Sequence, residues 1–575
     1  MSDSSEYDLR DVPHSPDSRE SPDSLDSQHS PDSQNSLDSR DSPNSFDVIV
    51  IGAGINGAGI ARDAAMRGLR VLQLDKGDVS NGTTAWSTRL IHGGLRYLEH
   101  LEIGLVRESL RERQVLLNIA PHLVKPIPML IPIYRHSKRS RLAIKAGMIA
   151  YDLLSLRKSL HWHQMLSKGE ALAREPGLNP EGLAGAAQYY DAQVQYAERL
   201  ALENVLGARE NGALICTHTR LDRFVVEGGR VLGIEYTDLL SGATGKAVAA
   251  ITINVTGPWV DQILEGAGTG AARLIGGTKG SHIVVSGFPG APREGLYAEA
   301  RSDGRPFFII PWNRLYLIGT TDIRYSGSLD SLRAGEAEIE YLIDEANHVI
   351  PGARLSRPSV LYSYAGVRPL PFAQGRRESA ITRRHIIHDH SADRRPLQGL
   401  ISVIGGKLTT YRNLSQQVVD AIFKKLGRVS PPCRTAEVTL PGAVGDGFAA
   451  FAHEFRKTSG VTETTADHLL GVYGIRASAV LEIAKEQPGL AKQIDPQTGA
   501  IAAEIVFCFN QELARTLGDA LLRRTMIGLG PDLGRGATDG ALEVCMTSLG
   551  WSEERAERER LDYLDHITRF NRVEH

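Results

Sequence analysis

A glycine-rich turn between two apolar runs constrains the fold of this chain more than any other feature. Residues 47–51 read DVIVI, which is typical of a buried parallel strand, and residues 52–57 read GAGING. Residues 58–67 then predict a helix that ends at Gly68, and residues 70–75 predict a second strand. A strand, a helix and a strand within about 30 residues indicate a βαβ unit in a parallel sheet.

The spacing of the glycines in this turn predicts a dinucleotide site. Gly52 permits the tight turn, Gly54 lets the backbone approach a pyrophosphate, and Gly57 allows the helix to pack closely on the strand. The pyrophosphate would lie at the helix N-terminus, where N–H groups and the dipole favour an anion. Asp75 can accept a hydrogen bond from a ribose hydroxyl. NAD and FAD both fit this motif, and a second glycine-bearing stretch at 82–98 favours the longer FAD.

The first 46 residues differ in composition from the remainder. They carry eleven acidic residues against three arginines, and a serine occupies every third position from Ser15 to Ser45. With almost nothing apolar to bury, this segment cannot offset the entropy lost on ordering, so we expect a disordered acidic tail of Ser, Asp and Pro. Its charge of -8 leaves +5 on the other 529 residues, out of a total of -3. This small excess predicts no nucleic-acid partner.

The cysteines and the apolar runs limit the compartment and the metal chemistry. Cys216, Cys433, Cys508 and Cys545 lie far apart without C-x-x-C spacing, so we expect a reducing compartment and no metal site. The N-terminus lacks a basic start followed by an apolar run, which argues against a secretory signal. No run of about 18 apolar residues is present, so we expect no membrane-spanning helix. These features predict a cytoplasmic location.

A series of motifs follows the acidic tail. They read DVIVIGAGINGAGIARDAAMRG at 47–68, WSTRLIHGGLRYLEH at 86–100, NVTGPWV at 254–260, KGSHIVV at 279–285, IPWNRLYLIGTTD at 310–322, YAGVRPL at 364–370, GGKLTTYR at 405–412 and LLRRT at 521–525. Their order resembles that of the respiratory, aerobic-type FAD-dependent glycerol-3-phosphate dehydrogenases, a branch of the glutathione-reductase/D-amino-acid-oxidase group. The resemblance implies an α/β fold with a Rossmann-like FAD-binding domain, a mixed-sheet substrate domain and a C-terminal helical domain.

Composition and resemblance together divide the chain into parts. We expect the tail at 1–46, an FAD-dependent oxidoreductase region at 47–430, a linker at 431–446 and the helical domain at 447–575. Inside the oxidoreductase region, we expect FAD-binding parts at about 47–115, 190–260 and 360–430, and a substrate domain mainly at 270–360.

The resemblance also implies an activity. The family oxidises sn-glycerol 3-phosphate to dihydroxyacetone phosphate by hydride transfer from C2 to N5 of FAD, and the electrons pass to a membrane quinone in glycerol and glycerophospholipid catabolism. One alternative is a glycerol-3-phosphate oxidase that uses O₂ and releases H₂O₂, because both enzymes share the substrate and flavin motifs. Two others are an amine or amino-acid oxidase on the same fold and a flavin-containing sensor.

The implied substrate is a phosphate dianion with a secondary alcohol, so its site needs fixed positive charge. Arg368 is our first candidate for the phosphate clamp, because a guanidinium offers a planar bidentate fork. The resemblance places Arg96 beside it and makes Thr320 a hydrogen-bond donor to the substrate. It also places Lys407 near the flavin, where a cation would stabilise negative charge on the reduced ring.

His92 and Tyr97 complete the expected substrate site. A histidine with a near-neutral pKa can accept the proton of the C2 hydroxyl, although His92 could instead only orient the substrate. The catalytic candidates are therefore His92, Arg96, Arg368 and Lys407. The substrate-binding candidates are Arg96, Tyr97, Thr320, Arg368 and Lys407.

The cofactor candidates lie in the glycine-rich turn, at the strand ends and in the later glycine loops. They are Gly52, Ala53, Gly54, Asn56, Gly57, Asp75, Thr84, Ser87, Gly93, Gly94, Thr256, Gly257, Gly405, Gly406, Lys407, Leu408 and Thr409.

A basic stretch that runs into an apolar helix predicts contact with a membrane surface. The basic residues are Arg135, Lys138, Arg139, Arg141 and Lys145, and residues 147–154 are largely apolar. Such a pattern suits docking at an anionic bilayer, and the alternative is a solvated basic face. A quinone acceptor resides in lipid, so we expect peripheral association with the inner face of the cytoplasmic membrane. We also expect a homodimer.

Overall fold

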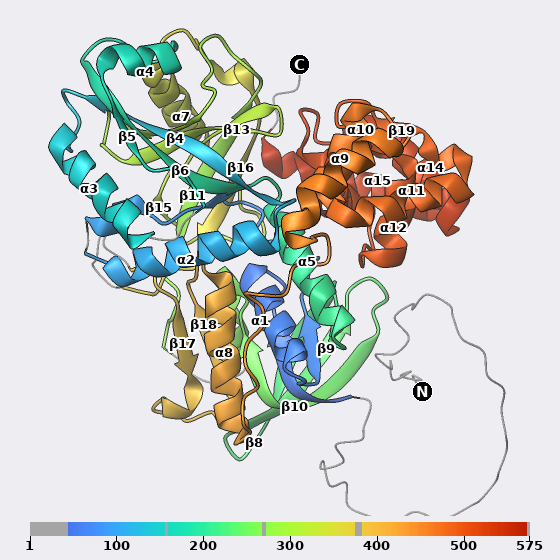
Figure 1. The fold of residues 1–575 in the computed structure, drawn as a ribbon. Helices are drawn as coiled ribbons and strands as arrows, with labels where there is room; N and C mark the ends of the chain where they lie inside the picture. Colours follow the sequence, from blue (N-terminus) through green and yellow to red (C-terminus); the bar gives the residue numbers. More distant parts are fainter. Residues whose placement is uncertain (1–43, 100, 156–158, 267–271, 374–381, 572–575) are drawn as a thin grey trace, which may run out of the picture.

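The computed structural model describes residues 44–99, 101–155, 159–266, 272–373 and 382–571. The lower part of Figure 1 is built around a sheet, here called sheet A, whose central strands are parallel. Their order is β17 (Ile386–Asp389), β18 (Leu400–Ile404), β10 (Thr244–Asn254), β1 (Ser45–Ile51), β2 (Val71–Leu74) and β7 (Leu214–Cys216). A hairpin of β8 (Thr219–Glu227) and β9 (Arg230–Asp238) pairs antiparallel with β10.

The predicted βαβ unit is formed by β1, α1 (Ile55–Met66) and β2. Val48 and Val50 of β1 belong to a core shared with α1, α5 (Ala197–Glu210) and α8 (Tyr411–Leu426). Ile49 and Ile51 point to the other face and pack with the β8–β9 hairpin and α6 (Val260–Gly266). Both faces of the strand are therefore buried, which explains its unbroken apolar run.

A second, mixed sheet, here called sheet B, fills the upper part of Figure 1. β12 pairs with β4 in parallel, and the other described pairs are antiparallel. Its main order is β15 (Ile323–Arg324), β11 (Thr278–Val285), β14 (Leu315–Gly319), β13 (Pro306–Trp312), β12 (Gly295–Glu299), β4 (Val124–Tyr134), β6 (Leu183–Val194) and β3 (Leu90–Ile91). β16 (Val360–Arg368) pairs with β11, and β5 (Gln164–Leu166) pairs with β6.

Helices cover both faces of sheet B. α4 (Lys168–Arg174) and α7 (Glu336–Val349) share one hydrophobic cluster with the sheet, and α2 (Ile103–Ile119) and α3 (Arg141–Leu154) share another. The sheet thus takes strands from 90–194 as well as from 278–368, a wider span than the 270–360 named in the sequence. The proline-rich stretch before residue 134 is extended, because β4 runs antiparallel to β6 over its whole length.

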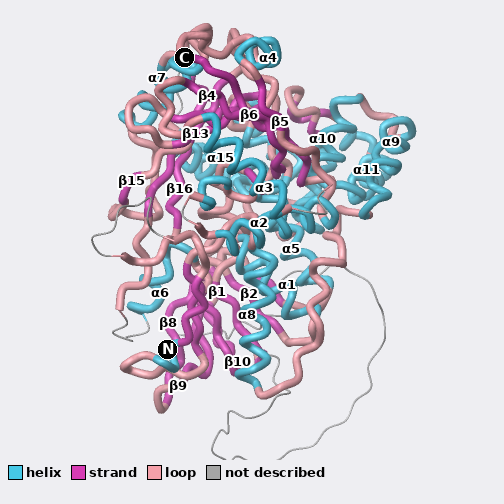
Figure 2. Tube along the Cα trace, turned by 60° about the vertical axis from the view of Figure 1, so that its left-hand side comes forward, coloured by secondary structure: helices cyan, strands magenta, loops and turns pink. Residues whose placement is uncertain are grey.

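The C-terminal part is helical, as Figures 1 and 2 show. Its elements are α9 (Phe448–Thr458), α10 (Glu463–Tyr473), α11 (Ala477–Glu486), α12 (Ala502–Gln511), α13 (Leu517–Asp519), the turn η10 (Ala520–Arg524), α14 (Thr538–Leu549), α15 (Glu553–Ile567) and the short pair β19 (Gln493–Asp495) and β20 (Ala500–Ile501). The Tyr362 hydroxyl of β16 donates to the Leu529 carbonyl at 2.8 Å, and the rings of Trp86 and Phe570 meet edge to face at 5.2 Å.

A buried ion cluster joins this helical part to the loop after β2. Arg524 donates to both carboxylate oxygens of Asp78, at 2.7 and 2.8 Å. Arg523 donates to the same carboxylate at 2.6 Å and to Asp519 at 2.8 Å. The side chains of Asp78 and Arg524 are completely buried. The LLRRT motif therefore places two guanidinium groups on the carboxylate of Asp78, which is 445 residues from Arg523 and 446 residues from Arg524 in sequence.

Two expectations concern the ends of the chain and the membrane. Among the described residues, no helix combines the length and the apolarity that crossing a bilayer requires. Residues 1–43 of the predicted tail lie outside the described residues. β1 begins at Ser45, so its first two residues belong to the span that we assigned to the tail.

We expect Asp78→Ala to lower the free energy of unfolding by about 3–5 kcal/mol, because it leaves buried guanidinium charge without a partner. Urea unfolding followed by circular dichroism measures this change. Asp539→Ala is the matched control, since the Asp539 side chain is 77% exposed in its pair with Arg560 and such pairs contribute about 0–1 kcal/mol. Equal losses in both variants would contradict the prediction.

Candidate active site

The carboxyl ends of β1, β2 and β10 meet at one edge of sheet A and open into a cavity of about 430 Å³. Gly52, Asp75 and Thr256 line one end of this cavity, and residues 405–408 also line it. Parallel sheets bring their strand ends to one edge, and ligands of such folds bind there. We call this space the cofactor cavity.

Two glycines in the turn before α1 are required by close contacts. Gly52 has a φ of +114°, and a Cβ at this position would lie 2.8 Å from the Val255 carbonyl oxygen. A Cβ on Gly57 would lie 2.0 Å from the carbonyl oxygen of Gly52. The start of α1 therefore approaches the strand ends as closely as a backbone can, and it points into the cavity.

Hydrogen bonds fix this turn relative to β2. The Asp75 carboxylate accepts from the backbone N–H of Ala53 at 2.7 Å and from that of Gly77 at 2.9 Å. Burial raises the pKa of Asp75, and these two N–H groups oppose the shift. Thr84 Oγ1 accepts from the N–H of Ile55 at 3.1 Å and so satisfies one donor at the start of α1.

The loop between β18 and α8 lies against the first turn of α1. Gly405 and Gly406 have φ values of +77° and +97°. Asn56 Nδ2 donates to the Gly405 carbonyl at 3.2 Å, and a Cβ on Gly406 would lie 2.6 Å from the same nitrogen. Asn56 Oδ1 is buried and accepts no hydrogen bond from the described residues. Since Asn56 lines the cavity, this acceptor fits a ligand that carries hydroxyl or N–H donors.

A smaller cavity of about 200 Å³ adjoins the cofactor cavity. The two share the lining residues Thr83, Trp86, Ser87, Gly366, Lys407 and Leu408. His92, His282 and Arg368 line only the smaller one. Because basic and titratable side chains gather here beyond Lys407, we call this space the substrate cavity.

Arg368, the last residue of β16, is held by polar partners at the substrate cavity. Its Nη1 pairs with Asp322 Oδ1 at 3.1 Å, and its Nη2 donates to Thr320 Oγ1 at 3.0 Å. Arg383 Nη2 lies 3.3 Å from the other oxygen of Asp322. Burial lowers the pKa of Arg368, and Asp322 opposes this shift. Two guanidinium groups on one carboxylate leave net positive charge for an anionic ligand.

Lys407 stands between the two cavities. Its Nζ donates to Ser109 Oγ at 3.1 Å and lies 3.9 Å from the centre of the Tyr97 ring. Burial lowers the pKa of Lys407 to about 7, and the carboxylates of Glu108 and Glu102 oppose the shift. The amine is therefore poised to change charge near neutral pH, and a nearby anion would keep it protonated.

His92 follows β3 directly and lines the substrate cavity. Its backbone N–H donates to Thr409 Oγ1 at 3.1 Å, which connects it to the loop after Lys407. Burial lowers the pKa of His92 to about 4, and the carboxylate of Asp191 opposes this shift. The imidazole is thus neutral at pH 7, and a neutral imidazole has one ring nitrogen that can accept a proton. Its pKa lies below the near-neutral value that the sequence led us to expect for a base, because the ring is desolvated.

Most predicted cofactor residues line the cofactor cavity. They are Gly52, Gly54, Asn56, Asp75, Thr84, Ser87, Thr256, Gly257, Gly405, Gly406, Lys407 and Leu408. The remaining five do not line this cavity. The Ala53 N–H donates to Asp75, Gly57 packs against Gly52, and Thr409 lines the substrate cavity. The Gly93 N–H donates to the Tyr151 hydroxyl, and Gly94 lies against the Tyr97 ring. Arg96 belongs to the turn η2 (Leu95–Leu98), and its side chain lies outside the described part of the structure.

Three polar residues, one in the substrate cavity and two in the charge network of Arg368, were not assigned from the sequence. His282 is buried, and its Nε2 lies 2.9 Å from Thr88 Oγ1. Asp322 and Arg383 form the charge network of Arg368. His282 and Asp322 stand inside the KGSHIVV and IGTTD motifs, so a search of each motif for polar residues would have found them. Arg383 lies in no motif, and only the fold brings it to Asp322.

Two family models match the chain. The model of the FAD dependent oxidoreductase family matches residues 47–412, and that of the C-terminal domain of alpha-glycerophosphate oxidase matches residues 433–556. A glycerol-3-phosphate dehydrogenase of Synechocystis sp. is 46% identical, over 91% of this chain and 96% of that protein. A glycerol-3-phosphate dehydrogenase of Mycobacterium leprae is 35% identical, over 90% of this chain and 87% of that protein.

Solved structures agree with these matches. The crystal structure of the glycerol-3-phosphate dehydrogenase from Bacillus halodurans, complexed with FAD, has a TM-score of 0.75 and 28% identity and covers 92% of this chain and 95% of that one. The L-α-glycerophosphate oxidase of Mycoplasma pneumoniae has a TM-score of 0.54 at 19% identity, covers 69% of this chain and 99% of that one, and so shares the fold. With FAD as its cofactor, this chain belongs to the FAD-dependent glycerol-3-phosphate dehydrogenase family.

Proposed function

We propose that this protein oxidises sn-glycerol 3-phosphate to dihydroxyacetone phosphate and passes the electrons to a membrane quinone. The observation that carries the proposal is the substrate cavity, which is lined by Arg368, Lys407 and the neutral His92. Arg368 also shares the Asp322 carboxylate with Arg383. A phosphate dianion with an adjacent secondary alcohol matches this arrangement of positive charge and proton acceptor. The named activities of the relatives support the same substrate.

In this proposal, the phosphate binds to the guanidinium groups. Arg368 is oriented by Asp322 and Thr320 and can offer its remaining N–H donors to phosphate oxygens. Asp322 also pairs with Arg383, so a second guanidinium lies across the same carboxylate from Arg368. Lys407, buried at the junction of the cavities, adds a third positive charge and remains protonated when a dianion lies near. Tyr97 lies under the Lys407 amine and holds it by a cation–π contact.

Oxidation removes a hydride from C2 of the alcohol and a proton from its hydroxyl group. A residue of this chain can accept the proton. When bound, FAD supplies the acceptor for the hydride that leaves C2. The turn at 52–57, Asp75, Asn56 and the loop at 405–408 would hold this cofactor. His92 accepts the hydroxyl proton on a ring nitrogen, since burial keeps its imidazole neutral at pH 7.

The substrate is tested by anaerobic titration of the purified, FAD-loaded protein. We expect sn-glycerol 3-phosphate to bleach the visible flavin band, while glycerol without phosphate leaves it unchanged because it cannot engage Arg368 and Arg383. No bleaching by sn-glycerol 3-phosphate would overturn the proposed substrate.

The same reduced protein tests the electron acceptor. The match of residues 433–556 to the C-terminal domain of alpha-glycerophosphate oxidase favours O₂ as a second candidate acceptor. Reoxidation by a soluble quinone analogue that is faster than reoxidation by air-saturated buffer supports the dehydrogenase. Fast reoxidation by O₂ with stoichiometric H₂O₂ supports the oxidase instead.

His92→Ala is expected to slow flavin reduction by about 10²–10⁴-fold, the usual contribution of a general base. The dissociation constant for the substrate should change much less, because the phosphate contacts remain. Stopped-flow absorbance under anaerobic conditions separates the two quantities. His282→Asn is the matched control for a second histidine of the same cavity. Reduction of the His92 variant at the parent rate would remove His92 from the proton transfer.

The surface of α3 supports peripheral membrane association. Leu142, Ile149 and Leu153 are 79%, 44% and 53% exposed, and their spacing places them on one face of the helix. Leu101 and Ile103, at the start of the neighbouring α2, are 80% and 50% exposed. On the opposite face of α3, the Tyr151 hydroxyl bonds to Gly93 N–H at 2.9 Å. Tyr151 thus connects the helix that carries the apolar face to Gly93, the residue after His92.

The basic residues of this region divide into two groups. Arg139 forms ion pairs with Glu99 and Glu299, and Lys138 donates to the Asp303 carbonyl at 2.8 Å, so these two side chains are already engaged by the protein. Arg141 and Lys145 lie exposed on α3 itself, and Arg141 Nη2 makes only a long hydrogen bond of 3.4 Å to the Leu166 carbonyl. We propose that these two and the apolar face contact the headgroups on the inner face of the cytoplasmic membrane. The homodimer remains a prediction from the sequence.

We expect the triple variant Leu142→Ser, Ile149→Ser, Leu153→Ser to bind anionic vesicles at least about tenfold more weakly, because each substitution removes apolar area from the contact. Vesicle sedimentation measures the partition. The control triple variant changes Leu240, Val429 and Leu561, which are exposed elsewhere, to Ser. Arg141→Ala with Lys145→Ala should reduce the salt dependence of binding. Unchanged binding by the α3 triple variant would exclude this face.

A further inference from the structure

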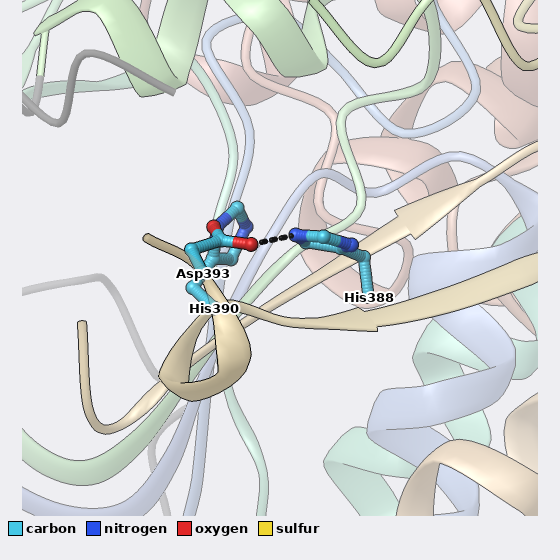
Figure 3. A group of neighbouring side chains, drawn as sticks. All are labelled: His388, His390 and Asp393. Atoms are coloured by element: carbon cyan, nitrogen blue, oxygen red, sulfur yellow. Dashed lines mark hydrogen bonds and ion pairs between the residues drawn. The ribbon is translucent and has the colours of Figure 1, made fainter. Parts of the chain in front are cut away.

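A cluster of two histidines and one aspartate lies on sheet A, apart from both cavities. His388 belongs to β17, His390 begins the short turn η6 (His390–Ala392), and Asp393 follows it. The three side chains gather at the carboxylate of Asp393, as Figure 3 shows. His390 is buried, whereas the side chains of His388 and Asp393 are 28% and 29% exposed. None of the three lines the cofactor cavity or the substrate cavity.

The geometry of the cluster brings three ligand atoms together. His388 Nε2 lies 2.9 Å from Asp393 Oδ1, and His390 Nδ1 lies 2.9 Å from Asp393 Oδ2. One atom of each residue lies within 4.8 Å of the other two. Imidazole nitrogens and carboxylate oxygens bind Zn²⁺ at about 2.0–2.2 Å, so small side-chain rotations would let one ion replace the protons now shared with Asp393.

A hydrogen bond to Ser402 orients the ring of His390, the buried histidine of the cluster. His390 Nε2 lies 2.8 Å from the hydroxyl of Ser402, a fully buried residue of β18. Histidines that bind metals usually bond through their other ring nitrogen to a polar group, which fixes the ring and its tautomer. Ser402 plays this part here and leaves Nδ1 directed at the cluster.

The neighbouring aspartate has other partners. Asp389 Oδ1 accepts from the N–H and the hydroxyl of Ser391, at 3.0 and 2.8 Å. Its Oδ2 pairs with Lys425 at 2.6 Å. These contacts shape the turn between His388 and Asp393 and keep the Lys425 charge on Asp389, so Asp393 is the carboxylate that both rings contact.

We propose that His388, His390 and Asp393 bind one divalent transition-metal ion of the Zn²⁺ class. Two imidazoles and one carboxylate suit zinc and its neighbours, whereas Mg²⁺ and Ca²⁺ prefer oxygen ligands. Water would complete the coordination, because two of the residues reach the surface. The three ligands form the pattern H-x-H-x-x-D at 388–393. From the sequence we expected no metal site, because we considered only the spacing of the cysteines.

The position of the site gives the ion a structural role. His388 lies opposite Ser402 in the antiparallel pair of β17 and β18. Arg383 precedes this hairpin, and the loop with Lys407 follows it. An ion that joins β17, the turn and, through Ser402, β18 would therefore fix the two strands that lie between Arg383 and the loop with Lys407. The proposal is independent of the substrate and of the electron acceptor.

Calorimetric titration of the chelator-treated, FAD-loaded protein with Zn²⁺ alone tests the site. We expect one ion per chain and a rise in the thermal unfolding temperature at saturation. His388→Asn and Asp393→Asn should each abolish both effects. Ser402→Ala should weaken binding by about 10–100-fold, the usual effect of removing a group that orients a ligand. His453→Asn, which changes an exposed histidine of α9, should bind as the parent does.

X-ray absorption at the zinc edge of the parent protein supplies a readout that does not depend on variants. Two imidazoles with oxygen ligands would support the assignment, and sulfur ligands or fewer than two imidazoles would overturn it. The absence of stoichiometric binding by the parent, or its retention in both ligand variants, would also overturn it.

Discussion

The contact between the start of α1 and the end of β1 sets the positions of the other functional parts. It exists because no side chain stands between Gly57 and the carbonyl of Gly52, where a Cβ would lie at 2.0 Å. From this fixed point, Asn56 reaches the Gly405 carbonyl, and α1 packs against both α5 and α8. The loop that carries Lys407 is thereby positioned by the same turn that would hold a pyrophosphate, although about 350 residues separate the two in sequence.

Burial is the common cause of the unusual ionisation in the substrate cavity. It lowers the pKa of His92, Lys407 and Arg368 alike, because each loses hydration of its charged form. The resulting charge states at pH 7 differ, because histidine, lysine and arginine have different ordinary pKa values. His92 becomes neutral at pH 7, Lys407 comes close to its midpoint, and an arginine stays charged. One pocket thus holds a neutral imidazole together with positive charge, which is what the proposed reaction requires.

Sequence patterns predicted the features that depend on interactions between residues close together in the chain. The βαβ unit follows from apolar periodicity and glycine spacing, both of which act within a few residues. The helical C-terminal part was expected from composition and from the family resemblance. The partners of Arg368 could not be read in this way. β11 pairs with β14 on one side and β16 on the other, and this pairing alone brings the residues near 320 to Arg368. The sequence predicted that Arg139 contacts a membrane surface, whereas the fold pairs its side chain with Glu99 and Glu299.

The ion cluster at Asp78 links the two ends of the folded chain. Asp78 lies in the loop after β2, and Arg523 and Arg524 follow it by 445 and 446 residues. A buried carboxylate without a partner is strongly unfavourable, so the loop beside Asp75 depends on these two arginines to compensate the charge of Asp78. Arg569, near the C-terminus, also lines the cofactor cavity. The geometry of the dinucleotide site therefore depends on the helical C-terminal part as well as on the glycines of its own turn.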